Sequence, residues 1–200
     1  SAAASNFAVL ANAAVTCTDG TIIGDVGTFQ ASPTGSVTRT SCPITGSVLV
    51  GDGVAQQAFN AFLAQYDALA AVPCDVVLTG TLAGVTLAPG AYCFDAAATL
   101  TGVLTLNGPS NGVWLFKIGT SGTGALTGTS FSVVMANGGQ ASNVYWQVAD
   151  AATMTDSVFQ GNILAGGAIT ITRGSLVGRA LAEGAVTMTG TNVHGSNAPL

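Results

Sequence analysis

Pairs of threonines that flank one apolar residue recur in the last third of the chain, and they offer hydroxyl and methyl groups at a regular spacing. Thr155, Thr172 and Thr189 close three of these pairs and recur at one fixed interval along the chain. A repeat this short, with glycines between the strands, is typical of a β-solenoid, in which each coil adds one strand to each face. Because successive side chains on a strand point to opposite sides, both threonines of a pair would face outward. The residues expected to face inward are Met154, Ile171 and Met188.

Outward threonines stacked in this way would form a stiff two-dimensional array. Two threonines of one strand lie about 6.7 Å apart, and neighbouring strands lie about 4.8 Å apart. The β-branched side chain has few χ1 options, so the array is rigid before any ligand arrives. Such an array suits a crystalline ligand such as ice, because methyl groups fit the hollows of its lattice while hydroxyls hold ordered water. The alternative is that threonine is simply favoured in strands, where outward positions need polar side chains.

The candidate contact residues extend upstream of the regular repeat. Further Thr-x-Thr pairs occur at 99–101 and 127–129, and one more threonine follows Gly190. We predict that the following residues contact the ligand: Thr99, Thr101, Thr127, Thr129, Thr153, Thr155, Thr170, Thr172, Thr187, Thr189 and Thr191.

Groups suited to catalysis do not form a recognisable motif in this sequence. The single histidine, His194, lies in a stretch rich in Gly, Ser and Asn. The carboxylates are scattered at expected turns or on a helix, where aspartate commonly caps or turns the chain. A β-helical polysaccharide lyase would need a carboxylate cluster and a basic residue on one groove, which Arg173 and Arg179 alone do not make. We therefore expect a protein that is not an enzyme, with no catalytic residues, no metal site and no cofactor.

Four cysteines, none of them in a Cys-x-x-Cys pair, favour disulfides over a zinc site. Spacing alone does not separate the three connectivities that four cysteines allow, and four buried free thiols are a further alternative. We favour the sequential pairs Cys17–Cys42 and Cys74–Cys93, since each would tie a loop-rich stretch to a neighbouring coil. Each bond would contribute about 2–4 kcal/mol and would place the protein outside the cytosol.

The composition argues against several classes of partner. Charged residues make up 6% of the chain, against roughly 25% in ordinary globular proteins. Four residues are basic, whereas nucleic acids and anionic lipids bind through clusters of Lys and Arg. No 18-residue run is free of polar residues, so no transmembrane helix is expected. We expect a monomer that binds neither nucleic acid nor membrane, and a start at Ser1 without Met fits a secreted, mature form whose signal peptide has been removed.

One stretch departs from the strand pattern. From 54 to 72, apolar residues recur at spacings of three and four, which predicts an amphipathic helix. Asp52 is a suitable N-cap, and Pro73 would stop the helix. The strands expected at 113–118 and 144–148 carry aromatic side chains, which we expect to face outward and to pack against this helix.

The remaining residues predict further coils, so that residues 1–200 form a single domain with the helix as an insertion. Coils recur from residue 76 onward. Those around 99–106 and 125–135 are spaced more widely than the regular repeat, because polar loops enlarge their corners. Short strands separated by turns between residues 6 and 50 predict another coil or two.

Short segments spread over the chain form a recognisable set. They are NVYWQV at 143–148, FQGNILA at 159–165, GRALA at 178–182, GDVG at 24–27, PGAY at 89–92 and GVWLF at 112–116. Together they resemble the microbial ice-binding (antifreeze) proteins built on a discontinuous β-solenoid. The resemblance implies a mostly β fold, a right-handed β-solenoid of triangular section with a long helix alongside, in which the N-terminal segment closes into the stack beside the C-terminal coils. It also implies a secreted protein without a cofactor that adsorbs to ice through one flat face, giving thermal hysteresis and inhibition of ice recrystallisation.

Some members of that family carry a Thr-(Ala/Gly)-x-(Thr/Asn) pattern on the ice-binding face. Residues 189–192 fit it fully, and residues 127–130 fit it approximately. The corresponding segments at Arg173 and Asp156 depart from it and would place charges at the edge of the array.

Two other functions are alternatives for the same sequence. The first is an extracellular adhesion or surface-interaction domain that has kept the fold and has no ice affinity. The second is a polysaccharide-active enzyme, which would reveal itself by a sugar-dependent shift in melting temperature or by product release, and we expect neither.

Overall fold

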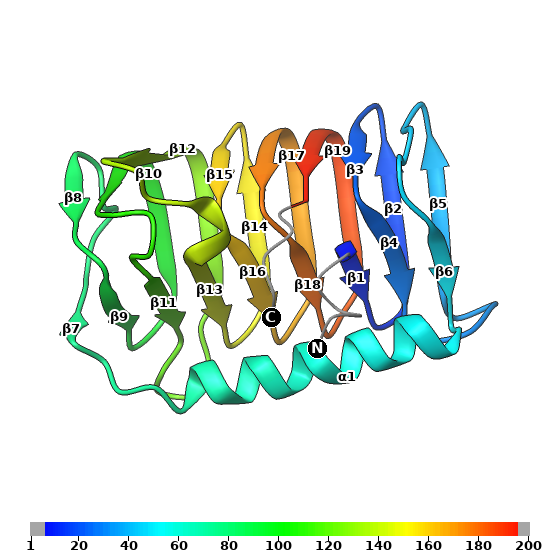
Figure 1. Cartoon of the computed structure of the whole chain (residues 1–200), viewed down its shortest axis with the longest axis horizontal. Coiled ribbons are helices and arrows are strands. Elements are labelled where there is room, and N and C mark those ends of the chain that lie inside the picture. Colours follow the sequence, from blue (N-terminus) through cyan, green and yellow to red (C-terminus); the bar gives the residue numbers. More distant parts are fainter. Residues whose placement is uncertain (1–6, 196–200) are drawn as a thin grey trace.

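The computed structural model describes residues 7–195, which form two β-sheets and one long helix (Figure 1). The prediction of a mostly β protein with one long helix is confirmed for this part of the chain. The elements are β1 (Phe7–Ala11), β2 (Ala14–Thr18), β3 (Thr21–Ile23), β4 (Asp25–Thr28), β5 (Ser36–Thr40), β6 (Val48–Val50), α1 (Gly53–Ala70), β7 (Val76–Val77), β8 (Val85–Leu87), β9 (Gly90–Phe94), β10 (Ala98–Asn107), β11 (Trp114–Ile118), β12 (Leu126–Ala136), the 3-10 helix η2 (Ala141–Asn143), β13 (Val144–Val148), β14 (Ala152–Thr155), β15 (Val158–Gln160), β16 (Asn162–Ala165), β17 (Ile169–Val177), β18 (Ala180–Ala182) and β19 (Val186–His194).

The order of the strands in space differs from their order in the chain. The nine-stranded sheet runs β6-β4-β1-β18-β16-β13-β11-β9-β7, and the ten-stranded sheet runs β5-β2-β19-β17-β14-β12-β10-β8, with β3 and β15 off this path. Three N-terminal strands therefore pair with C-terminal ones, β1 with β18 and both β2 and β3 with β19, and Figure 1 shows them as blue beside red. These pairings are parallel, like the others in both sheets, so the strands stack as layers that we call rungs. This agrees with the closure of the N-terminal segment that the resemblance implies.

Long strands of the ten-stranded sheet bend at a residue with positive φ. The angle is 73° at Gly102, 46° at Ser130, 51° at Arg173 and 60° at Gly190. On β12, the residues before the bend pair with β14 and a residue after it pairs with β15. Asp156, which directly follows β14, also has a φ of 51°. The bends form a continuous corner that divides the sheet into two halves, each with its own outward side chains.

The tryptophan and phenylalanine side chains of β11 and β13 point into the space between the two sheets. Phe116 and Trp146 stack with their ring centroids 4.0 Å apart, and Trp114 and Trp146 are fully buried. The two indole N–H groups donate to the main-chain oxygens of Leu87 and Gln160 at 3.1 and 3.0 Å. The expectation that the aromatics of these strands face outward toward the helix is therefore wrong for Trp114, Phe116 and Trp146, and it is confirmed for Tyr145, which packs against the helix cluster. The signal was present in the sequence, since Lys117 on β11 and Gln147 on β13 alternate with the inward apolar residues.

The helix begins and ends close to its predicted bounds. Its N-cap is Asp52, whose Oδ1 accepts a hydrogen bond of 2.8 Å from the main-chain N–H of Ala55, as predicted. It ends at Ala70, two residues earlier than predicted. The reason is that Val72 precedes Pro73, and the residue before a proline is disfavoured in the helical region.

The apolar stripe of α1 covers the outer side of the nine-stranded sheet. One cluster joins four buried residues of the helix to four outward residues of that sheet, and Phe62 in this cluster is fully buried. Burying one such side chain contributes about 1.5–3 kcal/mol. The cluster consists of Ala55, Ala58, Phe59 and Phe62 on α1 with Phe7, Leu10, Leu164 and Leu181 on the strands. The helix thus closes one side of the molecule and leaves the ten-stranded sheet on the other.

Two disulfides join the cysteines in the favoured sequential pairs. Cys17 bonds to Cys42, with 5.9 Å between their Cα atoms, and Cys74 bonds to Cys93, with 5.8 Å between them. The first lies near the β5 end of the stack and the second near the β7 end. The first disulfide joins β2 to the segment that follows β5, and the second joins β9 to the segment that precedes β7. Both ends of the stack are therefore cross-linked.

Candidate functional site

The parallel register aligns one threonine from every strand between β10 and β5 in a single row. Each member is paired directly with the next, without interruption at the junction between the C-terminal and N-terminal segments. The row consists of Thr99, Thr127, Thr153, Thr170, Thr187, Thr16 and Thr38.

A second row lies two residues further along the same strands. Thr101 holds the corresponding position on β10, where the register with β12 shifts between Leu100 and Gly102. From β12 onward the pairing is regular. The row consists of Thr129, Thr155, Thr172, Thr189, Thr18 and Thr40. We call the two rows together with Thr101 the threonine surface.

Apolar side chains between the two rows support this surface from inside. Met154, Ile171 and Met188 are at most 2% exposed, which confirms that they face inward. Leu100 and Cys17 occupy the same position on their strands and are equally buried. The main chain under the threonines therefore rests on a packed core, which keeps the hydroxyl and methyl groups at the spacing of the sheet.

Four threonines of this surface were not predicted from the sequence. Thr16, Thr18, Thr38 and Thr40 belong to β2 and β5 and complete the rows at one end. The signal was present, since Thr-Cys-Thr and Thr-Arg-Thr both have the Thr-x-Thr form. It was missed because these pairs do not follow the interval of the regular repeat and lie far from it in the chain.

Thr191 does not belong to the threonine surface, which corrects the prediction. Its side chain is fully buried, and its hydroxyl lies 3.1 Å from the main-chain oxygen of Ile171 and 3.2 Å from that of Thr189. The positive φ of Gly190 turns the chain at the corner, so that Thr191 begins the next half of the sheet with its side chain inward. Ser157 has the same place on its rung and also bonds back across the corner, to the oxygen of Thr155 at 2.9 Å.

One ion pair lies on the corner that borders the threonine surface. Arg173 donates from Nε to Oδ1 of Asp156 at 2.8 Å and from Nη2 to Oδ2 at 3.0 Å. This hydrogen bonding lowers the pKa of the Asp156 carboxyl and raises that of the Arg173 guanidinium. The two charges at the edge of the array, which the sequence predicted, therefore neutralise each other.

The arrangement offers contacts rather than reactive groups. Within residues 7–195 no three His, Cys, Asp or Glu side chains gather closely enough to hold a metal ion. His194, at the end of β19, pairs with Val177 and Ile23 and lies beyond the corner from the threonine surface.

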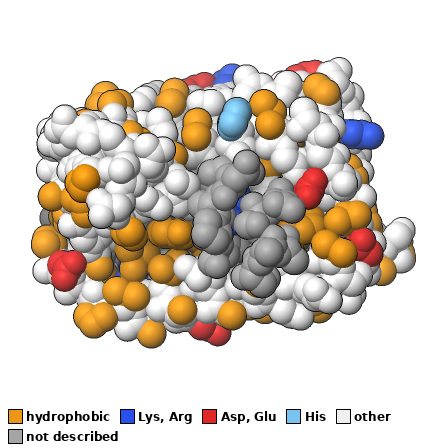
Figure 2. Space-filling view, in the orientation of Figure 1, with side chains coloured by type: hydrophobic (Ala, Val, Ile, Leu, Met, Phe, Trp, Pro, Cys, Tyr) orange, Lys and Arg blue, Asp and Glu red, His pale blue; other side chains and the backbone are white. Residues whose placement is uncertain are grey.

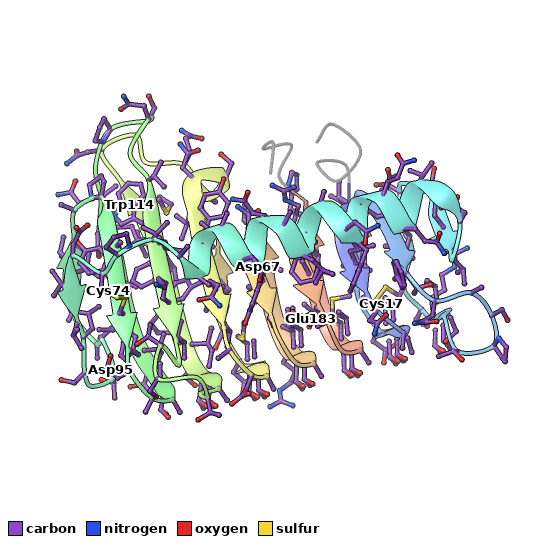
Figure 3. All side chains as sticks on the ribbon, turned by 90° about the horizontal axis from the view of Figure 1, so that it is seen from below. Cys17, Asp67, Cys74, Asp95, Trp114 and Glu183 are labelled. Atoms are coloured by element: carbon purple, nitrogen blue, oxygen red, sulfur yellow. A yellow bond between two sulfur atoms is a disulfide. The ribbon has the colours of Figure 1, made fainter. Side chains whose placement is uncertain are left out.

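Charged side chains are few and scattered on the face shown in Figure 2. In Figure 3, α1 runs along one side of the molecule, and short oxygen-bearing side chains project in a line from the opposite side.

The double row of threonines on stacked parallel strands is the most regular feature of this surface. The chain belongs to the ice-binding-like family, whose model matches residues 9–194. An ice-binding protein of Nostoc sp. (strain HG1) is 40% identical over 175 residues, covering 84% of this chain and 62% of that protein. One of Flavobacterium frigoris (strain PS1) is 33% identical over 187 residues and is covered to 65%. The chain thus spans a little less than two thirds of these relatives.

Solved structures show the same fold over almost the whole chain. The crystal structure of the ice-binding protein of the Antarctic ascomycete Antarctomyces psychrotrophicus superposes with a TM-score of 0.88 at 34% sequence identity. That match covers 98% of this chain and 97% of the other.

Proposed function

We propose that this protein binds ice through the threonine surface. The observation that carries the proposal is the double row itself, in which threonine is paired with threonine on rung after rung. Hydroxyl and methyl groups recur about every 4.8 Å across the strands and about 6.7 Å along them. Such a surface holds water in a repeating pattern, and a rigid surface loses little entropy when it docks on a lattice. Adsorbed protein would produce thermal hysteresis and slow the recrystallisation of ice.

The fold that we propose for this function is a right-handed β-solenoid of triangular section, with residues 1–200 as a single domain. The nine-stranded sheet supplies one side, and the two halves of the ten-stranded sheet supply the other two. Its helix occupies the outer side of the nine-stranded sheet, which leaves the threonine surface free for a flat ligand.

The same reasoning supports a secreted, monomeric binding protein that is not an enzyme. Two disulfides favour an extracellular location. Among the described residues, no helix is long and apolar enough to cross a membrane. The few basic side chains favour neither nucleic acid nor anionic lipid as a partner.

The decisive experiment measures the melting and freezing temperatures of a single ice crystal held in a solution of the purified protein. We expect a gap between its melting and freezing temperatures, together with faceted growth, because adsorbed protein blocks the addition of water to the bound planes. The absence of a gap, of shaping and of any slowing of recrystallisation would contradict the proposal. The adhesion or surface-interaction domain would then be the better interpretation of the fold.

A further inference from the structure

The corner beside the threonine surface carries a charged pair at its middle. The corner residues of successive rungs share a positive φ, and most of them are small or uncharged. Asp156 and Arg173 follow Thr155 and Thr172, on rungs that have at least two further threonine rungs on each side. In spatial order, the corner residues are Leu82, Gly102, Ser130, Asp156, Arg173, Gly190, Asp19 and Ser41.

Arginine is an unfavourable choice for this conformation. A left-handed backbone brings Cβ close to the following carbonyl oxygen, which is unfavourable for residues other than Gly, Asn and Asp. Gly190 holds the same place on the next rung with φ at 60°, so glycine fits the corner. A strained residue of this kind persists where its surroundings hold it, and such positions cluster at functional sites. Here the surroundings include the two-pronged ion pair with Asp156.

The position of the Arg173 guanidinium determines which groups contact water at the edge of the threonine surface. Arg173 is 63% exposed and directly follows Thr172, so an unpaired side chain would be free to turn over the neighbouring threonines. A free guanidinium orients water toward its own N–H groups, in competition with the pattern that the hydroxyls hold. In the observed geometry Nε and Nη2 point at the carboxylate of the adjacent rung, and the two charges cancel locally.

We propose that Asp156 is a positioning residue for the ice-binding surface, because its carboxylate holds the Arg173 guanidinium along the corner and away from the two rows of threonines. This inference rests on the proposed function. It assigns the pair a role in ice affinity that goes beyond the stability of the fold, since exposed ion pairs contribute little to stability.

The test compares the freezing-point gap of the wild type with that of Asp156→Asn, Arg173→Lys and the double variant Asp156→Asn/Arg173→Gly. We expect Asp156→Asn to lose most of the gap, because it leaves an unpaired cation beside Thr172. Arg173→Lys keeps the charge but cannot form the bidentate hydrogen bonds to both carboxylate oxygens, so this variant should lose part of the gap. The double variant removes both charges and places a glycine at a positive φ, so it should recover the gap of the wild type.

Controls separate this inference from the proposed function and from a folding defect. Asp67→Asn makes the same change in net charge on α1, along the opposite side of the molecule in Figure 3, and should keep the gap. A wild type without a gap would refute the proposed function. A wild type with a gap that Asp156→Asn retains in full would overturn the present inference alone. Failure of the double variant to recover the gap would also overturn it, because a purely structural pair gives no such rescue.

Discussion

Lys117 donates a hydrogen bond of 2.7 Å from Nζ to the main-chain oxygen of Val72, just beyond the C-terminal end of α1. The Lys117 side chain lies on β11 and is 7% exposed. Burial lowers the pKa of its amine, yet the amine meets the negative end of the helix dipole. The contact joins the segment that directly follows α1 to the nine-stranded sheet.

Lys117→Met should therefore lower the stability of the fold. The oxygen of Val72 would lose its charged donor, and hydrogen bonds to charged groups contribute about 1.5–3 kcal/mol. Thermal denaturation followed by circular dichroism measures the loss. Gln57→Ala, at an exposed position on the same helix, is the matched control and should change little. An unchanged melting temperature for Lys117→Met would show that the contact is not formed in solution.

Glu183 provides a prediction about pH. Its pKa is raised above the ordinary value of 4.5, first by partial burial and then by the negative charge of Asp67. The folded state therefore binds the Glu183 proton more tightly than the unfolded state does. The stability from this group is present in full below about pH 4.5 and is lost as the pH rises through the folded-state pKa.

Glu183→Gln should remove this pH dependence. We expect the variant and the wild type to melt at similar temperatures in acid, and the variant to melt slightly higher at neutral pH. Melting curves from pH 3 to about pH 8 cover the window in which this carboxyl titrates. A variant that melts lower than the wild type at neutral pH would show that the carboxylate is stabilising there.

Thr170→Tyr tests the location of the ice contact. Thr170 lies near the middle of the first row, between Thr153 and Thr187. A tyrosine there would stand above the neighbouring threonines and hold a lattice away from them. We expect the freezing-point gap to be nearly abolished while the melting temperature of the protein stays close to that of the wild type.

The matched control for that variant is Thr105→Tyr, on the other half of the ten-stranded sheet. Thr105 pairs with Thr86 and Val134 beyond the corner. The Thr105→Tyr variant should keep the freezing-point gap of the wild type. If Thr105→Tyr abolished the gap and Thr170→Tyr did not, the site would lie on that other half.

Thr18→Tyr tests whether the N-terminal rungs belong to the site. Thr18 continues the second row directly from Thr189. Because the contact energy sums over the whole surface, we expect a clear reduction of the gap that is smaller than for the central Thr170→Tyr. A full wild-type gap would restrict the site to the rungs from β10 to β19.

The sequence was most informative where a short pattern repeats. The regular interval of the threonine pairs predicted stacked strands with Met154, Ile171 and Met188 inside, and the structure confirms these positions. The helix was predicted within two residues at its C-terminal end, since Asp52 and Pro73 mark its ends by local chemistry. Local rules of this kind depend on neighbouring residues, which the sequence displays directly.

Positions that depend on distant parts of the chain were harder to predict. The orientation of Trp114 and Trp146 was predicted wrongly, because the apolar stripe of α1 was expected to pack against their side chains. The buried strand residues that pack against α1 lie instead on β1, β16 and β18. Thr191 has the residue type of the surface and lies inside because the corner falls one residue before it. Thr16 and Thr38 join the first row only because β2 pairs with β19, a contact that the spacing of the residues does not reveal.

The departure of rung order from chain order has a consequence for biosynthesis. β1 and β2 leave the ribosome first, whereas their partners β18 and β19 leave it near the end of this sequence. The hydrogen bond between Thr21 and Asn192 spans 171 residues. Closing so long a loop is slow, and until it closes β1, β2, β18 and β19 are unpaired edges to which other chains can bind. The rows of threonines thus become continuous only after β19 has left the ribosome, and a chain that lacks β19 carries them in two separate pieces.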